Sequence, residues 1–241
     1  MSYPSAVALP ATAVLDQPEP DVLRLMVGMI KGGVGKSTTV WMLLCELAKR
    51  GHRALGVDAD PSSQTLADCY REAIANGYQV PFEVISWPSP VGLVNGVGKA
   101  ADERRATAVV IDVGGDGDAI FDQAALYADE LLIPTGPTPP EMRRLPATFT
   151  AAARVHALSP IAPQVLLVRT TSRARDEQLA RDWLASVPLP GGASGLPVLD
   201  ARVPYSVLIP RLFGHVVEDT GPYADVLDEI LANRAAEGAA A

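Results

Sequence analysis

The sequence predicts an α/β fold with a mostly parallel, twisted sheet and helices on both of its faces. Apolar runs of strand length alternate with helical patterns, and a glycine-rich loop separates the first strand from the first helix. Strands and helices that alternate in this way form right-handed βαβ units, and such sheets bind ligands at the carboxyl ends of their strands. With 241 residues, of which 48% are apolar, the chain can bury one sizeable core. We therefore expect a single domain over residues 23–236.

Six segments have the length and apolar character of buried strands. They are residues 23–30, 53–58, 108–112, 130–134, 165–169 and 198–203. Six helices are expected over residues 37–50, 64–76, 119–128, 140–158, 176–186 and 222–236. The first of these is the clearest, because its apolar side chains recur on one face and Gly51 follows a basic last turn.

The two ends of the chain carry weaker patterns. Residues 1–22 contain four prolines and lack the basic start and apolar run of a secretory signal, so we expect a mobile proline-rich tail. Residues 237–241 are expected to form a second tail. No stretch reaches the roughly 18 apolar residues of a spanning helix, and the C-terminal segment has no basic amphipathic stripe. These patterns predict a cytoplasmic protein without membrane attachment.

Charge and cysteine content narrow the function. The formal net charge of −8 argues against a protein whose whole surface binds nucleic acid, although it leaves room for a local basic patch. Cys45 and Cys69 are the only cysteines and form no CxxC pair. We therefore expect a reducing compartment and no structural zinc.

Residues 31–39 read K-G-G-V-G-K-S-T-T and connect the first strand to the first helix. Glycines let the backbone curl so that successive N–H groups face an anion, and the helix N-terminus adds partial positive charge. The pattern predicts a phosphate loop, in which Lys36 reaches the β and γ phosphates and the Ser37 hydroxyl binds Mg²⁺. The expected nucleotide contacts also include Gly32, Gly33, Val34, Gly35 and Thr38. The alternative is a glycine-rich turn whose lysine is merely solvated.

Aspartates end two of the expected strands. The second strand ends in Asp58-Ala59-Asp60-Pro61, and the third ends in Asp112. Carboxylates at strand ends beside a phosphate loop can orient water or hold Mg²⁺ through water. Taken without that neighbour, such aspartates are more often turn formers.

The loop departs from the general phosphate-loop pattern at its start. Ile30 occupies the place of the first glycine, and Lys31 stands five residues before Lys36. In this form the loop resembles the deviant Walker A motif of the ParA/MinD family. The D-x-D-P run, the strand before Asp112, the A-D-x-x-x-x-P run from Ala128 and the Val203-Pro204 pair extend the resemblance over most of residues 26–232.

The resemblance implies a role for each matching residue. Lys31 would cross a dimer interface to the partner's nucleotide. Asp60 would position the attacking water and Asp58 would support the metal, whereas Asp112 would hold Mg²⁺ through a water. Pro204 would lie beside the adenine, and no N-K-x-D guanine motif is present. The sequence departs from the family at residues 62–64, which read S-S-Q where most relatives continue with glutamine, and at residues 113–117, which replace T-P-P-G.

The segment before Leu23 is too short for a helix-turn-helix domain, so the chain is most similar to the small ParA partition ATPases without one. That similarity implies slow ATP hydrolysis coupled to a monomer–dimer switch. The ATP-bound dimer would bind nucleoid DNA without sequence preference, and a ParB-like centromere-binding partner would stimulate hydrolysis and so move a plasmid or chromosome. The second half of the chain supplies the arginines for DNA binding, which are Arg143, Arg144, Arg169, Arg173, Arg175, Arg181, Arg202 and Arg211.

Three other functions are weighed against partition. A MinD-like positioning ATPase would need a membrane-binding amphipathic helix at its C-terminus, and an iron–sulfur carrier would need a CxxC pair. A P-loop biosynthetic ligase would need a substrate pocket in place of the second lysine, Lys31.

Overall fold

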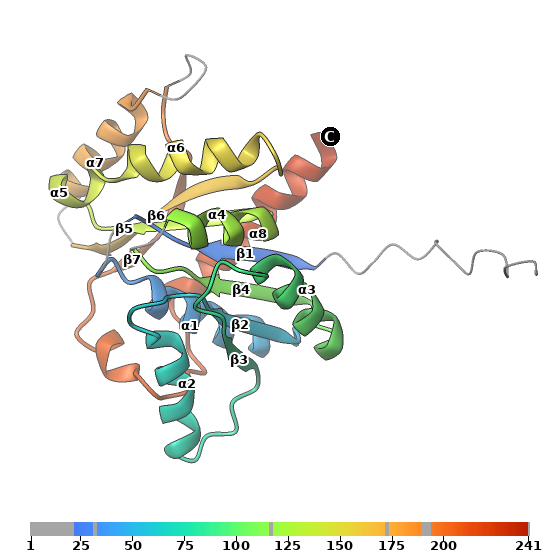
Figure 1. Ribbon diagram of the computed structural model, residues 1–241. Coiled ribbons are helices and arrows are strands. Elements are labelled where there is room, and N and C mark those ends of the chain that lie inside the picture. Colours follow the sequence, from blue (N-terminus) through green and yellow to red (C-terminus); the bar gives the residue numbers. More distant parts are fainter. Residues whose placement is uncertain (1–21, 31–32, 116–117, 172–173, 189–193, 241) are drawn as a thin grey trace, which may run out of the picture.

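The computed structural model describes residues 22–30, 33–115, 118–171, 174–188 and 194–240, which contain a seven-stranded sheet (Figure 1). The strands are β1 Leu23–Val27, β2 Ala54–Asp58, β3 Glu83–Ser86, β4 Ala108–Asp112, β5 Glu130–Thr135, β6 Ala162–Thr170 and β7 Val198–Pro204. Their order is β3-β2-β4-β1-β5-β6-β7, and each neighbouring pair is parallel. The expected parallel sheet is therefore confirmed.

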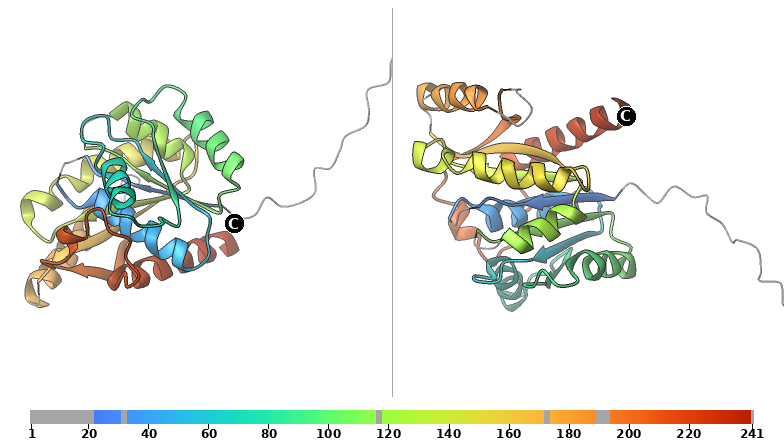
Figure 2. Two further views of the ribbon diagram at one scale, coloured as in Figure 1. Left: turned by 90° about the horizontal axis from the view of Figure 1, so that it is seen from below. Right: turned by 45° about the horizontal axis from the view of Figure 1, so that its top comes forward.

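Helices cover both faces of the sheet (Figure 2). One face is covered by α1 Lys36–Lys49, α2 Thr65–Ala75 and α8 Pro222–Ala240, and the other by α3 Leu93–Arg104, α4 Asp118–Tyr127, α6 Leu145–His156 and α7 Ala174–Ser186. Side chains alternate between two apolar cores: Met26 and Ile111 belong to one core, whereas Leu25 and Val110 belong to the other. Because both faces are buried, the strands read as continuous apolar runs.

The topology places a ligand site beside β1. From β1 the chain proceeds to one edge of the sheet through β2 and β3, and it later reaches the opposite edge through β5, β6 and β7. The direction of winding therefore reverses at the centre of the sheet. Open parallel sheets bind ligands at such a reversal, outside the carboxyl ends of the strands.

Among the strands and α-helices, β3 and α3 were not expected from the sequence. β3 is a partly exposed edge strand of four residues, and α3 contains Gly96 and Gly98, which weaken a helical pattern. Gly96 is needed for packing, since a Cβ there would lie 2.0 Å from the Trp87 ring.

Other boundaries also differ from those expected. The helix expected over residues 140–158 is two helices, α5 Pro139–Met142 and α6, and Pro146 lies in the first turn of α6, where its missing N–H does no harm. The first strand ends at Val27 rather than at Ile30. The last helix was expected to end at residue 236, but α8 continues to Ala240. The prediction of a tail over residues 237–241 is therefore wrong for the residues up to Ala240.

The tail expected over residues 1–22 lies outside the described residues, apart from Val22. Within the part of the chain that the structure describes, no helix is long and apolar enough to cross a membrane.

Candidate functional site

The loop between β1 and α1 has backbone conformations that suit glycine. The φ angles of Gly33 and Gly35 are 75° and 87°, in the left-handed region that strains other residues. Gly35 directly precedes α1 and has no side chain to cap it, so an anion can accept hydrogen bonds from the first N–H groups of the helix. Lys31 and Gly32 lie outside the described residues.

The start of α1 brings a cation and a hydroxyl to the end of β4. Lys36 is 7% exposed and Ser37 is half-buried, whereas Thr38 is exposed. Val34 is fully buried and fixes the loop to the apolar core. Lys36 and Ser37 lie close enough to Asp112 to influence its ionisation. The structure therefore brings these three predicted site residues together.

Asp112 is the most perturbed group of the site. Its pKa is raised from 3.8 to about 7, mainly by burial and also by the charges of Asp58 and Asp60, whereas the Ser37 hydroxyl and the Lys36 charge act to lower it. Neither carboxylate oxygen reaches hydrogen-bond geometry with any part of the described chain. A buried charge without a partner is costly. Asp112 is therefore poised to take up either a proton or a cation.

Asp58 lies opposite Asp112 in the pairing of β2 with β4. Its two oxygens accept hydrogen bonds from the backbone N–H of Asp60, at 3.1 Å, and of Ala67, at 2.8 Å. Burial raises its pKa, and these two N–H groups act in the opposite direction. The structure shows Asp58 holding the loop between β2 and α2, and its expected support of a metal stays a prediction.

Asp60 is ionised and held in place by its own loop. One oxygen accepts from the Ser62 N–H and the Ser62 hydroxyl, both at 2.8 Å, and from the Ser63 N–H at 3.2 Å. The other oxygen accepts from the Ser63 hydroxyl at 2.7 Å. Burial acts to raise the pKa of Asp60, but these hydrogen bonds outweigh it and lower the pKa. The two serines were noticed in the sequence only as a departure from the family pattern.

Gly114 brings the loop after β4 against Asp60. A Cβ at Gly114 would lie 2.6 Å from the Oδ1 of Asp60, so only glycine allows this approach. This contact was not predicted from the sequence, where the Gly114-Gly115 pair is its only signal. Asp116 and Gly117, farther along the loop, lie outside the described residues.

Pro204 lies beside the phosphate loop, and its expected place beside the adenine stays a prediction. It lines a cavity of about 140 Å³ together with Val34, Gly35 and Thr38. Ile209 also lines this cavity, together with Arg169, Tyr205 and Tyr223, which were not predicted from the sequence as part of a nucleotide site. The cavity offers an apolar wall next to the helix N-terminus, and a nucleotide base would suit it.

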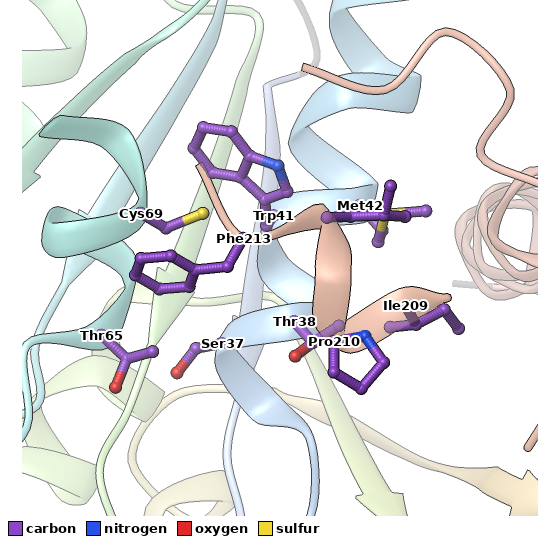
Figure 3. Close-up of a pocket in the computed structure, with 10 residues that line it drawn as sticks. Ser37, Thr38, Trp41, Met42, Thr65, Cys69, Ile209, Pro210 and Phe213 are labelled. Carbon is purple, nitrogen blue, oxygen red and sulfur yellow. The ribbon is translucent and has the colours of Figure 1, made fainter. Parts of the chain in front are cut away.

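A second, smaller cavity of about 70 Å³ is lined in part by the 3-10 helix η1 Ile209–Leu212 (Figure 3). Figure 3 shows Cys69 and Phe213 on one side of this cavity and Met42 and Ile209 on the other. Ser37 and Thr38, from the start of α1, also line it. The two cavities share Thr38, Ile209 and Pro210, so they adjoin one another at η1.

No group of three His, Cys, Asp or Glu side chains that could hold a metal ion occurs among the described residues. A cation beside Asp112 would therefore take most of its ligands from water and phosphate. Mg²⁺ binds in this way, because it keeps several waters and uses one or two carboxylates with substrate phosphates. The unpaired oxygens of Asp112 and the hydroxyl of Ser37 fit such an ion.

The expected basic patch is smaller than the sequence implied. Arg169 pairs with Glu141, and both Arg181 and Arg202 pair with Glu177, so two carboxylates offset part of the charge of these three arginines. Arg173 lies outside the described residues. The remaining four are exposed and have no side-chain partner in the described chain; they are Arg143, Arg144, Arg175 and Arg211.

Several solved structures share this fold. McdA from Cyanthece superposes with a TM-score of 0.67 and 17% identity, covering 87% of this chain and 99% of that chain. Cobyrinic acid a,c-diamide synthase from Mycobacterium smegmatis, with a bound ATP analogue and magnesium, gives 0.68 and 16%, covering 87% and 94%. A putative plasmid partition protein from Borrelia burgdorferi, bound to AMPPNP, gives 0.62 and 14%, covering 88% and 99%. At these identities the likeness establishes the fold alone.

Sequence comparison defines the family. No curated protein matches the chain in sequence. The family model described as the CobQ/CobB/MinD/ParA nucleotide binding domain matches residues 25–215, which is more than half of the chain. The match includes the phosphate loop and all three site aspartates. The chain therefore belongs to the CobQ/CobB/MinD/ParA family of nucleotide-binding domains.

Proposed function

We propose that the chain binds ATP with Mg²⁺, hydrolyses it slowly, and acts as a partition ATPase whose ATP-bound dimer binds DNA. The proposal rests on one observation: Lys36, Asp60 and Asp112 lie close together at the carboxyl ends of β2 and β4. A cation, an ionised carboxylate and an unpaired buried carboxyl are the groups that phosphoryl transfer to water requires. Similar structures that hold an ATP analogue with magnesium, or AMPPNP, support the choice of nucleotide.

Each residue has a distinct role in this proposal. Lys36 and the first N–H groups of α1 bind the phosphates, because they supply positive charge at the loop. Ser37 and Asp112 would hold Mg²⁺, which neutralises charge on the phosphates when it is bound. A bound cation would lower the pKa of Asp112, so this carboxyl would be ionised in the complex at neutral pH.

Asp60 positions the attacking water. It stays ionised at neutral pH because its loop lowers its pKa. The oxygen that pairs only with the Ser63 hydroxyl retains lone pairs for a water, whereas the other oxygen accepts three hydrogen bonds. Asp58 acts through the loop that it holds.

Dimerisation and DNA binding complete the proposal. Lys31 reaches the nucleotide of a second copy, as the family resemblance implies. The four exposed arginines without partners in the described chain lie between α5 and α6, at the start of α7 and on η1, in segments that follow β5, β6 and β7. Two modest patches joined in a dimer gain affinity from effective concentration. A ParB-like partner would stimulate hydrolysis and release a nucleoid-associated dimer.

A synthase function is the alternative, because a cobyrinic acid a,c-diamide synthase has a similar structure. A cavity of about 540 Å³ between α5 and α7 would serve as its substrate site. This cavity is lined by Pro139, Met142, Arg143, Leu179 and Trp183, among others. The two functions differ in what ATP controls: DNA binding in the first, and conversion of a small molecule in the second.

The test is retention on non-specific DNA with a non-hydrolysable ATP analogue, with ADP and without nucleotide. We expect retention only with the analogue, and a steep loss between 50 and 200 mM salt, because arginines displace phosphate counterions. The double variant Arg143→Ala/Arg144→Ala should bind DNA more weakly. The slope of log affinity against log salt concentration should become shallower by about one for each phosphate that the variant no longer neutralises. Arg71→Ala is the matched control, since Arg71 is exposed on α2 and pairs with Asp68. Equal retention with and without the analogue would rule out the switch.

A further inference from the structure

Arg169 leaves the regular path of β6 at the edge of the candidate site. Val168 pairs with Val203 and Thr170 with Pro204, so Arg169 is an extra residue in this strand. Its φ angle is 56°, in the left-handed region that residues other than glycine rarely adopt. Bulges of this kind re-aim a side chain and are frequent next to active sites. Here the bulge turns the arginine toward the phosphate loop.

The guanidinium joins three parts of the fold. One nitrogen, Nη1, donates to the carbonyl oxygen of Gly33 at 3.1 Å. The other terminal nitrogen, Nη2, pairs with Oε1 of Glu141 on α5. Oε2 of Glu141 in turn accepts a hydrogen bond from the Thr138 hydroxyl at 2.7 Å. The phosphate loop, β6 and α5 are thereby linked through one side chain.

The sequence makes room for this link. A Cβ at Gly136 would lie 2.2 Å from Oε2 of Glu141 and 3.2 Å from Nη2 of Arg169. Any other residue at position 136 would therefore displace the pair. The Glu141 side chain is only 15% exposed, so its contact with Arg169 is shielded better than an ordinary surface ion pair.

The contact with Gly33 has a consequence for the nucleotide. A trans peptide is planar, and its C=O and N–H point in opposite directions. When Arg169 holds the Gly33 carbonyl oxygen, it also fixes the direction of the Val34 N–H. The N–H groups of this loop are those that a phosphate would accept. Arg169 thus orients a donor without using its own charge on the phosphates.

We propose that Arg169, held by Glu141, positions the phosphate loop for nucleotide binding and couples that loop to α5. The inference rests on the proposed function, because it assigns a nucleotide to the loop. Arg169 is a positioning residue in this role rather than part of a DNA surface. Glu141 lies two residues before the exposed Arg143, so the bridge connects the nucleotide site with the proposed DNA-binding surface.

The experiment is a double-mutant cycle on affinity for a fluorescent ATP analogue. We expect Arg169→Gln to weaken binding roughly tenfold, as loss of a charge-assisted hydrogen bond does. Glu141→Gln should weaken binding less, and the double variant should resemble Arg169→Gln, because Glu141 acts only through the arginine. Arg169→Lys should restore affinity in part, since one ammonium reaches only one of the two acceptors. Arg154→Gln is the matched control, because it breaks the ion pair with Asp122 away from the loop.

Hydrogen exchange provides a second readout that needs no nucleotide. In Arg169→Gln, the amides of residues 34–36 should exchange several-fold faster, whereas Arg154→Gln should leave them unchanged. If the parent bound no nucleotide, the proposed function would fail, and exchange would still decide whether Arg169 fixes the loop. Parental exchange in the loop of Arg169→Gln, parental ATP affinity of that variant, or additive losses in the cycle would each overturn the proposal.

Discussion

Replacing Asp112 by asparagine should make the stability of the fold less dependent on pH. The Asp112 carboxyl is buried without a hydrogen-bond partner in the described chain, and its pKa rises from 3.8 to about 7. In the unfolded chain this carboxyl ionises near pH 4. Between pH 4 and pH 7 the folded state therefore binds more protons than the unfolded state. Stability that depends on this proton is present below pH 4 and is lost as the pH rises through 7.

The magnitude follows from the pKa. Each pKa unit corresponds to about 1.4 kcal/mol, so Asp112 should lower the free energy of unfolding by about 3 kcal/mol between pH 5 and pH 8. Asparagine has nearly the same shape and no charge to lose. The Asp112→Asn variant should therefore lack this fall, although its unpaired amide costs about 1–3 kcal/mol at both pH values.

Urea unfolding followed by circular dichroism at pH 5 and pH 8 measures this difference. Glu130→Gln is the matched control, because Glu130 is also buried, its pKa is raised to about 7 by burial and by Glu237, and it lies at the opposite end of the sheet. Both variants should reduce the pH dependence, but only Asp112→Asn should lose Mg²⁺-dependent nucleotide binding. If Asp112→Asn kept the parental difference between pH 5 and pH 8, the account of this carboxyl as an unpaired buried acid would be wrong.

Three further substitutions separate binding from hydrolysis. Lys36→Ala should abolish nucleotide binding, measured by titration with a fluorescent analogue, because it removes the cation aimed at the phosphates; parental affinity would refute the phosphate-loop assignment. Asp60→Ala should keep that affinity and slow phosphate release by about 100-fold or more, since water positioning matters only toward the transition state; a parental rate would move this role elsewhere. Gly114→Ala should slow phosphate release by displacing Asp60, because the added carbon would lie 2.6 Å from Oδ1 of Asp60. Gly98→Ala is the control, since a Cβ at this helical position makes only an ordinary 3.9 Å contact. Equal rates of phosphate release in the two variants would contradict this role of Gly114.

The sequence predicted the strands that are buried on both faces of the sheet. β1, β4 and β5 are covered on both faces and therefore show as uninterrupted apolar runs. β3 escaped because it lies at an edge of the sheet and is partly exposed, so neither alternation nor an apolar run marks it. Gly96, one of the two glycines that weaken the helical pattern of α3, serves its packing against Trp87, which is a tertiary contact and leaves no local pattern.

The site was readable in part for a similar reason. A phosphate loop needs consecutive glycines and a lysine, so Gly33, Gly35 and Lys36 form a local pattern. Contacts made between distant segments have no such signature. The link from Arg169 to Gly33 spans 136 residues of sequence, and its signals are a strand bulge and an ordinary glycine.

The exposure of individual arginines was equally beyond the sequence. Arg169 and Arg202 look alike in the chain, and both are ion-paired in the fold, whereas Arg143 and Arg211 are exposed without partners in the described chain. Charge counting therefore overestimated the basic patch, because it cannot see which acids fold against which bases.

The central claim is that ATP joins two copies of this chain into a dimer. The molar mass of the protein in solution tests this claim most directly. Light scattering with a non-hydrolysable ATP analogue and Mg²⁺ should show the parent as a dimer, and with ADP as a monomer. Lys31→Ala should bind the analogue through Lys36 and the loop N–H groups, yet remain monomeric, because Lys31 acts across the interface. A parent that stays monomeric with the analogue, or a Lys31→Ala variant that dimerises as the parent does, would contradict the account and leave a nucleotide-binding domain without the switch.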